Sequence, residues 1–180
     1  LNKALQIAQN ALTLPDTQDK PGPWQWTNRS NRISLYIFLA NCYIQQILGD
    51  KATEAQNQEW LTKAEQAVHE IEQLYGSGEE PQVVKWQGML ELAKGNKKIA
   101  VKKLYSTYEQ LRASGNMDAQ LSYTLADCFK NTAEVGAATQ FLASALNAGI
   151  GWTIPEAHLE YAEVALQQEA WASAIAGINT

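Results

Sequence analysis

Residues 64–71 read AEQAVHEI, residues 100–107 read AVKKLYST and residues 138–145 read ATQFLASA, and these three stretches decide the fold. In each stretch an alanine is followed at +4 and +7 by small or apolar residues. Positions 0, +4 and +7 lie on one stripe of an α-helix. Each stretch therefore predicts a helix whose alanine sits where another backbone comes close.

The alanine stripe recurs along the chain at a nearly constant period. Ala64, Ala100, Ala138 and Ala174 are 36, 38 and 36 residues apart, a period that fits one helix pair per unit. Ala4 starts the same pattern 60 residues before Ala64, so about two dozen residues are inserted between the first two stripes. The further members of the stripes are Ala8, Ala11, Val68, Ile71, Leu104, Thr107, Leu142, Ala145 and Ile178.

The insertion is expected to contain two loops. Residues 15–32 hold Pro15, Pro21 and Pro23, which a helix interior does not tolerate, and they predict a Pro/Trp-rich loop. Its two tryptophans, Trp24 and Trp26, are expected to pack rather than to stand exposed for a partner, because exposed aromatic patches lower solubility. The rest of the insertion is assigned to residues 49–58, and residues 1–14 to the second helix of a preceding unit.

A partner helix is predicted ahead of each stripe, over residues 33–48, 83–94, 122–131 and 155–168. Glycines and prolines separate the helices, and Pro81 and Pro155 suit a first helical turn, where the missing N–H costs nothing. No segment shows the alternation of apolar and polar residues that is typical of a strand. The sequence predicts an all-α fold of about eight to nine helices.

Several residues resemble the tetratricopeptide repeat. A small residue is followed three positions later by an aromatic in Ala40/Tyr43 and in Ala126/Phe129, then come a turn and the alanine stripe. Trp171 matches an aromatic position of that family. The resemblance covers residues 33–180 as about four helix pairs, and it implies an α-solenoid, a right-handed superhelix of antiparallel helix pairs forming one domain. A helical-hairpin solenoid of another family is the alternative.

Composition excludes several classes of function. The 180 residues are 46% hydrophobic and carry a net charge of −5, so the chain can bury a core but lacks the basic surface that nucleic acid requires. No apolar stretch is long enough to span a bilayer, because Asn41, Gln45 and Gln46 interrupt residues 33–48. The chain starts without methionine and stops just after a helical pattern, so we expect a piece of a longer protein. Its compartment stays open, with the two cysteines slightly favouring the cytoplasm over a bacterial periplasm.

The residues do not predict a metal site or a cofactor. His69 and His158 lack a second ligand at metal-binding spacing. Cys42 and Cys128 lie two units apart, too far for a disulfide, and are expected to be buried thiols. Glu156, Glu160 and Glu163 share one helix face and could in principle divide acid and base roles, but a solvated face explains them without chemistry. An enzyme is therefore the least favoured class.

Positive charge gathers on the middle unit, at Lys97, Lys98, Lys102 and Lys103, with Lys85 and Lys94 nearby. Such a group can steer an acidic partner. It can equally be a solvated face that balances the glutamates of residues 65–80.

The resemblance implies that the first helices of the pairs line a concave groove that binds a protein or peptide. Aromatic and amide side chains suit an extended peptide, since they offer stacking area and hydrogen bonds. A glycan ligand of the bacterial envelope is the runner-up, and self-association through truncated repeat ends is a further possibility. The predicted groove residues are Asn41, Gln45, Lys85, Trp86, Met89, Tyr123, Asp127, Asn131, Glu160 and Glu163.

Overall fold

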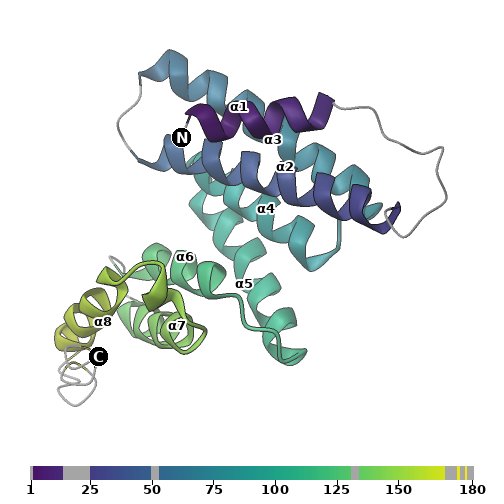
Figure 1. The fold of residues 1–180 in the computed structure, drawn as a ribbon. Coiled ribbons are helices and arrows are strands. Elements are labelled where there is room, and N and C mark those ends of the chain that lie inside the picture. Colours follow the sequence, from purple (N-terminus) through teal and green to yellow (C-terminus); the bar gives the residue numbers. More distant parts are fainter. Residues whose placement is uncertain are drawn as a thin grey trace. The chain divides into compact units, whose positions relative to one another are not determined.

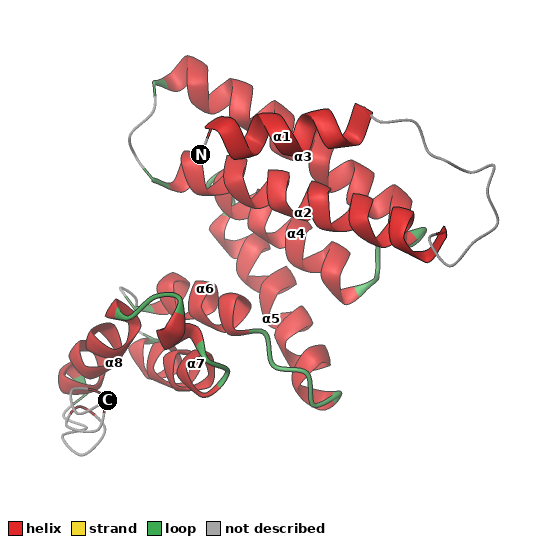
Figure 2. Cartoon of the chain, in the orientation of Figure 1, coloured by secondary structure: helices red, strands yellow, loops and turns green. Residues whose placement is uncertain are grey.

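The computed structural model describes residues 2–13, 25–49, 53–130, 134–168, 174 and 177. Over these residues the chain forms eight α-helices and one 3-10 turn, with no strand (Figures 1 and 2). Consecutive helices pack in adjacent pairs, so the predicted all-α class is confirmed. The chain divides into two compact units, Leu1–Ala100 and Val101–Thr180, and each is described by itself.

The first unit is built from four helices: α1 (Asn2–Thr13), α2 (Gln25–Leu48), α3 (Glu54–Tyr75) and α4 (Pro81–Ala93). α2 packs against α1, α3 and α4, and α3 also packs against α4. Figure 1 shows α1 and α3 beside the long α2. A helix that packs against two neighbours must be apolar over much of its circumference, and α4 meets this requirement with five buried apolar residues in thirteen, beside the buried Lys85.

The predicted loops are shorter than expected. α2 begins at Gln25, so the assignment of residues 25–32 to a loop is wrong. No proline or glycine follows Pro23 before Gly49, and the backbone is free to form helix as soon as the prolines end. α3 begins at Glu54, which likewise shortens the second predicted loop. Trp24 and the side chain of Trp26 lie outside the described residues.

Local signals set both ends of α3. Thr53 accepts a hydrogen bond from the backbone N–H of Gln56, whose side chain accepts one from the Thr53 backbone at 3.0 Å, forming a capping box. At the other end Gly76 adopts φ 73°, a left-handed conformation that glycine reaches without a steric penalty, and its N–H donates to the Glu72 carbonyl.

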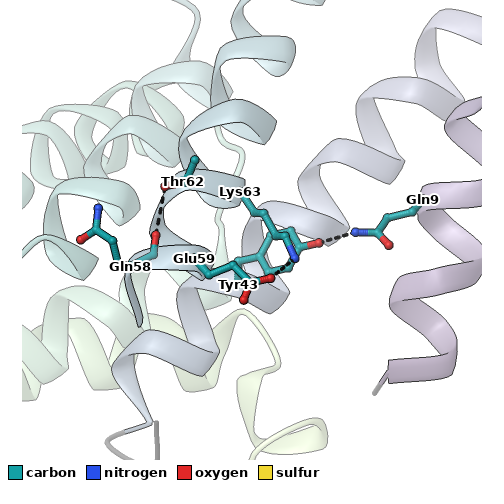
Figure 3. Close-up of polar contacts among 6 residues, drawn as sticks. All are labelled: Gln9, Tyr43, Gln58, Glu59, Thr62 and Lys63. Atoms are coloured by element: carbon teal, nitrogen blue, oxygen red, sulfur yellow. Dashed lines mark hydrogen bonds and ion pairs between the residues drawn. The ribbon is translucent and has the colours of Figure 1, made fainter. Parts of the chain in front are cut away.

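Tyr43 joins three helices of the first unit (Figure 3). It is only 5% exposed. Its hydroxyl accepts a hydrogen bond from Gln9 Nε2 of α1 at 2.7 Å, and the ammonium of Lys63 in α3 lies 5.9 Å from its ring centroid. Glu59 holds that ammonium at 2.5 Å. The aromatic residue that the repeat pattern singled out therefore links α2 to α1 and α3.

The second unit contains most of α5 (Lys97–Ala113), then α6 (Ala119–Phe129), α7 (Val135–Asn147), the 3-10 turn η1 (Ile150–Trp152) and α8 (Glu156–Gln167). α7 packs against α6 and α8, and η1 contacts all three. Phe141 of α7 stacks on Phe129 at 5.7 Å and meets Tyr108 of α5 edge-on at 5.1 Å, so it ties α5 and α6 to α7.

The alanine stripe lies in the core, as predicted. Ala64, Ala100 and Ala138 are fully buried, and Ala174 is 1% exposed. Ala4 is the exception, because it is exposed on α1 and only Ala8 of that stripe is buried. The stripe therefore marks the helix contact in α3, α5 and α7, where the repeat period is regular.

Both cysteines are free and buried, in agreement with the prediction. Burial raises the pKa of the Cys42 thiol, which makes its reactive thiolate scarcer. None of the described helices combines the length and the apolar character that crossing a bilayer requires.

Candidate binding surface on α6 and α8

Six polar side chains, from α6, from Lys130 directly after it and from α8, form one surface, which we call the α6–α8 surface. Its members are Tyr123, Asp127 and Lys130 next to Glu156, Glu160 and Glu163. On each helix the three residues are spaced 0, +4 and +7, so they occupy a single stripe. Tyr123, Asp127, Glu160 and Glu163 were predicted as groove residues, and the structure brings these four together.

Tyr123 is positioned by an apolar cluster. Its ring packs against Ala145, Ile150 and Ala157, which come from α7, η1 and the first turn of α8. The buried Ile150 anchors η1 in this cluster, and η1 carries the chain from α7 to the start of α8. The Tyr123 hydroxyl then donates a hydrogen bond to Glu160 Oε1 at 2.9 Å, which joins α6 to α8.

The surroundings of Tyr123 favour its neutral form. Burial raises the pKa of the phenol well above its usual range, and the hydrogen bond to Glu160 and the charges of Glu160, Asp127 and Glu156 raise it further. Tyr123 therefore acts at neutral pH as a donor that orients a carboxylate.

One cation balances part of the negative charge. Lys130 Nζ lies 2.6 Å from Asp127 Oδ1. This hydrogen bond raises the pKa of Lys130 despite partial burial, and the charges of Asp127, Glu160 and Glu163 add to the effect. With four carboxylates and one ammonium, the α6–α8 surface stays negative.

Most of the predicted groove residues of the first unit are buried, unlike those described in the second unit. Asn41 is half-buried and Gln45 exposed on α2. Lys85, Trp86 and Met89 are 7%, 5% and 1% exposed on α4, so their assignment to an open groove is a misplacement that the structure corrects. The reason is that α4 packs against both α2 and α3, which leaves little of its circumference open.

Trp86 has an unusual environment in this core. The Lys85 ammonium lies 5.4 Å from its ring centroid, within range of a cation–π interaction. Its indole Nε1 is buried and finds no acceptor among the described residues. Its contribution is packing of the first unit. Asn131 lies outside the described residues.

Two members of the α6–α8 surface were missing from the predicted site. Lys130 could have been found, because it lies three residues after Asp127 and seven after Tyr123 on one helix stripe. Glu156 was recognised as part of an acidic face but not as a neighbour of Tyr123. That proximity depends on how η1 turns the chain between α7 and α8.

The histidines and Lys94 were the other candidates from the sequence. The described residues contain no group of three or more His, Cys, Asp or Glu side chains arranged to hold a metal ion. His69 is exposed, and the His158 ring packs so closely over Gly151 that a Cβ built there would lie 2.3 Å from Nε2. Lys94 is paired with Glu65 at 2.8 Å and Glu91 at 3.6 Å.

Comparison with known proteins gives no relative: no protein-family model, no curated protein and no solved structure matches the chain. Its function must therefore be inferred from its own residues.

Proposed function

We propose that the chain is a non-catalytic protein-interaction module that binds a protein or peptide on the α6–α8 surface. The helix pairs stack as a tetratricopeptide-like solenoid in this proposal, with α6 and α8 as the first helices of successive pairs. One observation carries it: Tyr123, Asp127, Glu160 and Glu163, chosen from the repeat register alone, gather on one negatively charged surface.

The negative charge of the α6–α8 surface favours a partner that carries lysine or arginine. Of its four carboxylates, Asp127 is paired with Lys130 and Glu160 accepts from Tyr123, while Glu156 and Glu163 are exposed. Lysine or arginine side chains of a partner would bind these two with charge-assisted hydrogen bonds. The partially buried Tyr123 ring adds apolar area of the kind that anchors interfaces.

Site-directed photocrosslinking tests the proposal. A benzophenone amino acid at position 127, in the centre of the surface, should give an adduct with a protein or peptide when cells that make the chain are irradiated. The same amino acid at Gln140, exposed on α7, is the matched control. Protease should destroy the partner part of the adduct, and Lys130→Glu, which makes the surface more negative, should raise the yield for a basic partner.

Two results would contradict the proposal. Equal adducts at positions 127 and 140 would mean that the α6–α8 surface is not selective. An adduct that resists protease but is cleaved by glycosidases would establish the glycan alternative instead.

A further inference from the structure

Two helices present exposed apolar side chains that the proposed function does not use. On α8, Leu159 and Leu166 are 57% and 40% exposed, and Glu163 lies between them. On α5, Ile99 and Tyr105 are 51% and 47% exposed, and Lys102 lies between them. We call these sets the α8 triad and the α5 triad.

The two triads are similar in length and opposite in charge. Ile99, Lys102 and Tyr105 follow one another at three-residue steps, whereas Leu159, Glu163 and Leu166 are spaced four and three residues apart. At a rise of about 1.5 Å per residue, the triads span about 9 and about 10 Å. Laid antiparallel, each offers an apolar, a charged and an apolar side chain in the same order.

The charged members of both triads are available for a new contact. Lys102 and Glu163 are exposed, and neither takes part in an ion pair within the part of the chain that the structure describes. Each has a like-charged exposed residue nearby on its own helix, Lys98 on α5 and Glu156 on α8. The contact would therefore join a basic helix face to an acidic one.

Each triad lies on the outer side of its helix. Ala157, Ala162 and Ala165 are buried on the opposite side of α8, where Gly177 also packs close to Tyr161 and Ala162. On α5, Ala100, Leu104 and Thr107 are fully buried on the inner side.

We propose that a second copy of this chain covers the α8 triad with its α5 triad. Lys102 of one copy pairs with Glu163 of the other, Ile99 packs on Leu166, and Tyr105 packs on Leu159. The contact joins two different surfaces, so it is heterologous and leaves one free triad of each kind on every pair. Assembly therefore continues beyond a dimer into rings or filaments as concentration rises.

Sedimentation velocity of the 180-residue chain over a range of concentrations tests this inference. The wild-type chain should form oligomers, and either Lys102→Glu or Glu163→Lys should weaken self-association at least about tenfold, because each places like charges opposite one another. The double variant with both changes should associate like the wild type, since it restores an opposite pair. An equimolar mixture of the two single variants should also associate.

Matched controls separate the triads from a general charge effect. Lys3→Glu on α1 and Glu79→Lys before α4 change the net charge as much as Lys102→Glu and Glu163→Lys do, but at exposed positions outside the triads. Both control variants should associate like the wild type. A wild-type chain that stays monomeric at every concentration overturns the proposal. So does a double variant that fails to recover while its circular dichroism remains native. Glu163 belongs to the α6–α8 surface as well, but sedimentation of the purified chain involves no other partner, so a failure of self-association and a failure of capture at position 127 remain distinguishable.

Discussion

Tyr123 gives the most specific residue-scale prediction, because its pKa depends on contacts with a second helix. Ultraviolet absorbance titration of the wild type minus that of Tyr123→Phe isolates this phenol. Its midpoint should lie well above the usual value of about 10, owing first to burial and then to Glu160. Glu160→Gln should lower the midpoint but leave it above the usual value, because the phenol is still buried.

The same pKa fixes the direction of a pH effect on stability. A phenol whose pKa is raised on folding keeps its proton in the folded state after the unfolded state has lost it. The stabilisation is therefore complete below about pH 10 and declines as pH rises above that value. A wild-type midpoint at or below the usual value would contradict the packing of Tyr123 against α8.

Trp86 and Trp152 form a matched pair for the second residue-scale prediction. Trp86 is 5% exposed, and Trp86→Ala should cost about 3–5 kcal/mol of unfolding free energy through the cavity that it creates. Trp152 is 92% exposed, and Trp152→Ala should change that free energy by less than about 0.5 kcal/mol. Equal effects in urea denaturation would mean that α4 is not buried as described.

These residues also show where prediction from sequence stops. A stripe of small and apolar residues at 0, +4 and +7 identified the buried side of α3, α5 and α7, where Ala64, Ala100 and Ala138 are fully buried. Whether the other sides are open depends on how many neighbours the helix has, which no local pattern reveals. Trp86 and Met89 were therefore assigned to the groove although they are buried, whereas Tyr123 is only partly buried and lies beside α8.

At the scale of elements, the small size of Ala138 sets how closely α7 packs on its neighbours. Ala138→Leu should destabilise the fold by about 1–3 kcal/mol, because the site has no room for three more carbons. Gln140→Leu, at an exposed position two residues further along α7, should change stability by less than about 0.5 kcal/mol. If thermal unfolding shows the two variants to be equally stable, the alanine stripe is not a helix contact.

The start of α3 tests a local signal that sequence alone can reveal. Thr53→Ala removes the acceptor for the Gln56 N–H and should cost about 1 kcal/mol. Thr62→Ala, inside α3 and exposed, should be neutral or slightly stabilising, because alanine is the better helix former. If urea denaturation shows that both variants lose unfolding free energy, the effect comes from the threonine side chain in general and not from the cap.

At the scale of the whole molecule, the repeat period predicted the order and the class of the helices. Helices were expected over residues 33–48, 83–94, 122–131 and 155–168, and α2, α4, α6 and α8 occupy these places within a few residues apart from the earlier start of α2. The division at Ala100 and Val101 was not predicted, because it falls inside α5, where no glycine or proline interrupts the pattern. The carboxylates of α8 were recognised, but their contact with α6 depends on η1, three residues without a repeat signature.

Affinity measured beside stability for Asp127→Lys tests the central claim most directly. If the α6–α8 surface binds a basic partner, this variant should bind the partner captured at position 127 at least about tenfold more weakly. Its melting temperature should fall by no more than about 4 °C, because an exposed ion pair contributes at most about 1 kcal/mol. Unchanged affinity in a folded variant, or a loss of affinity that only follows unfolding, would contradict the claim that this surface is the binding site.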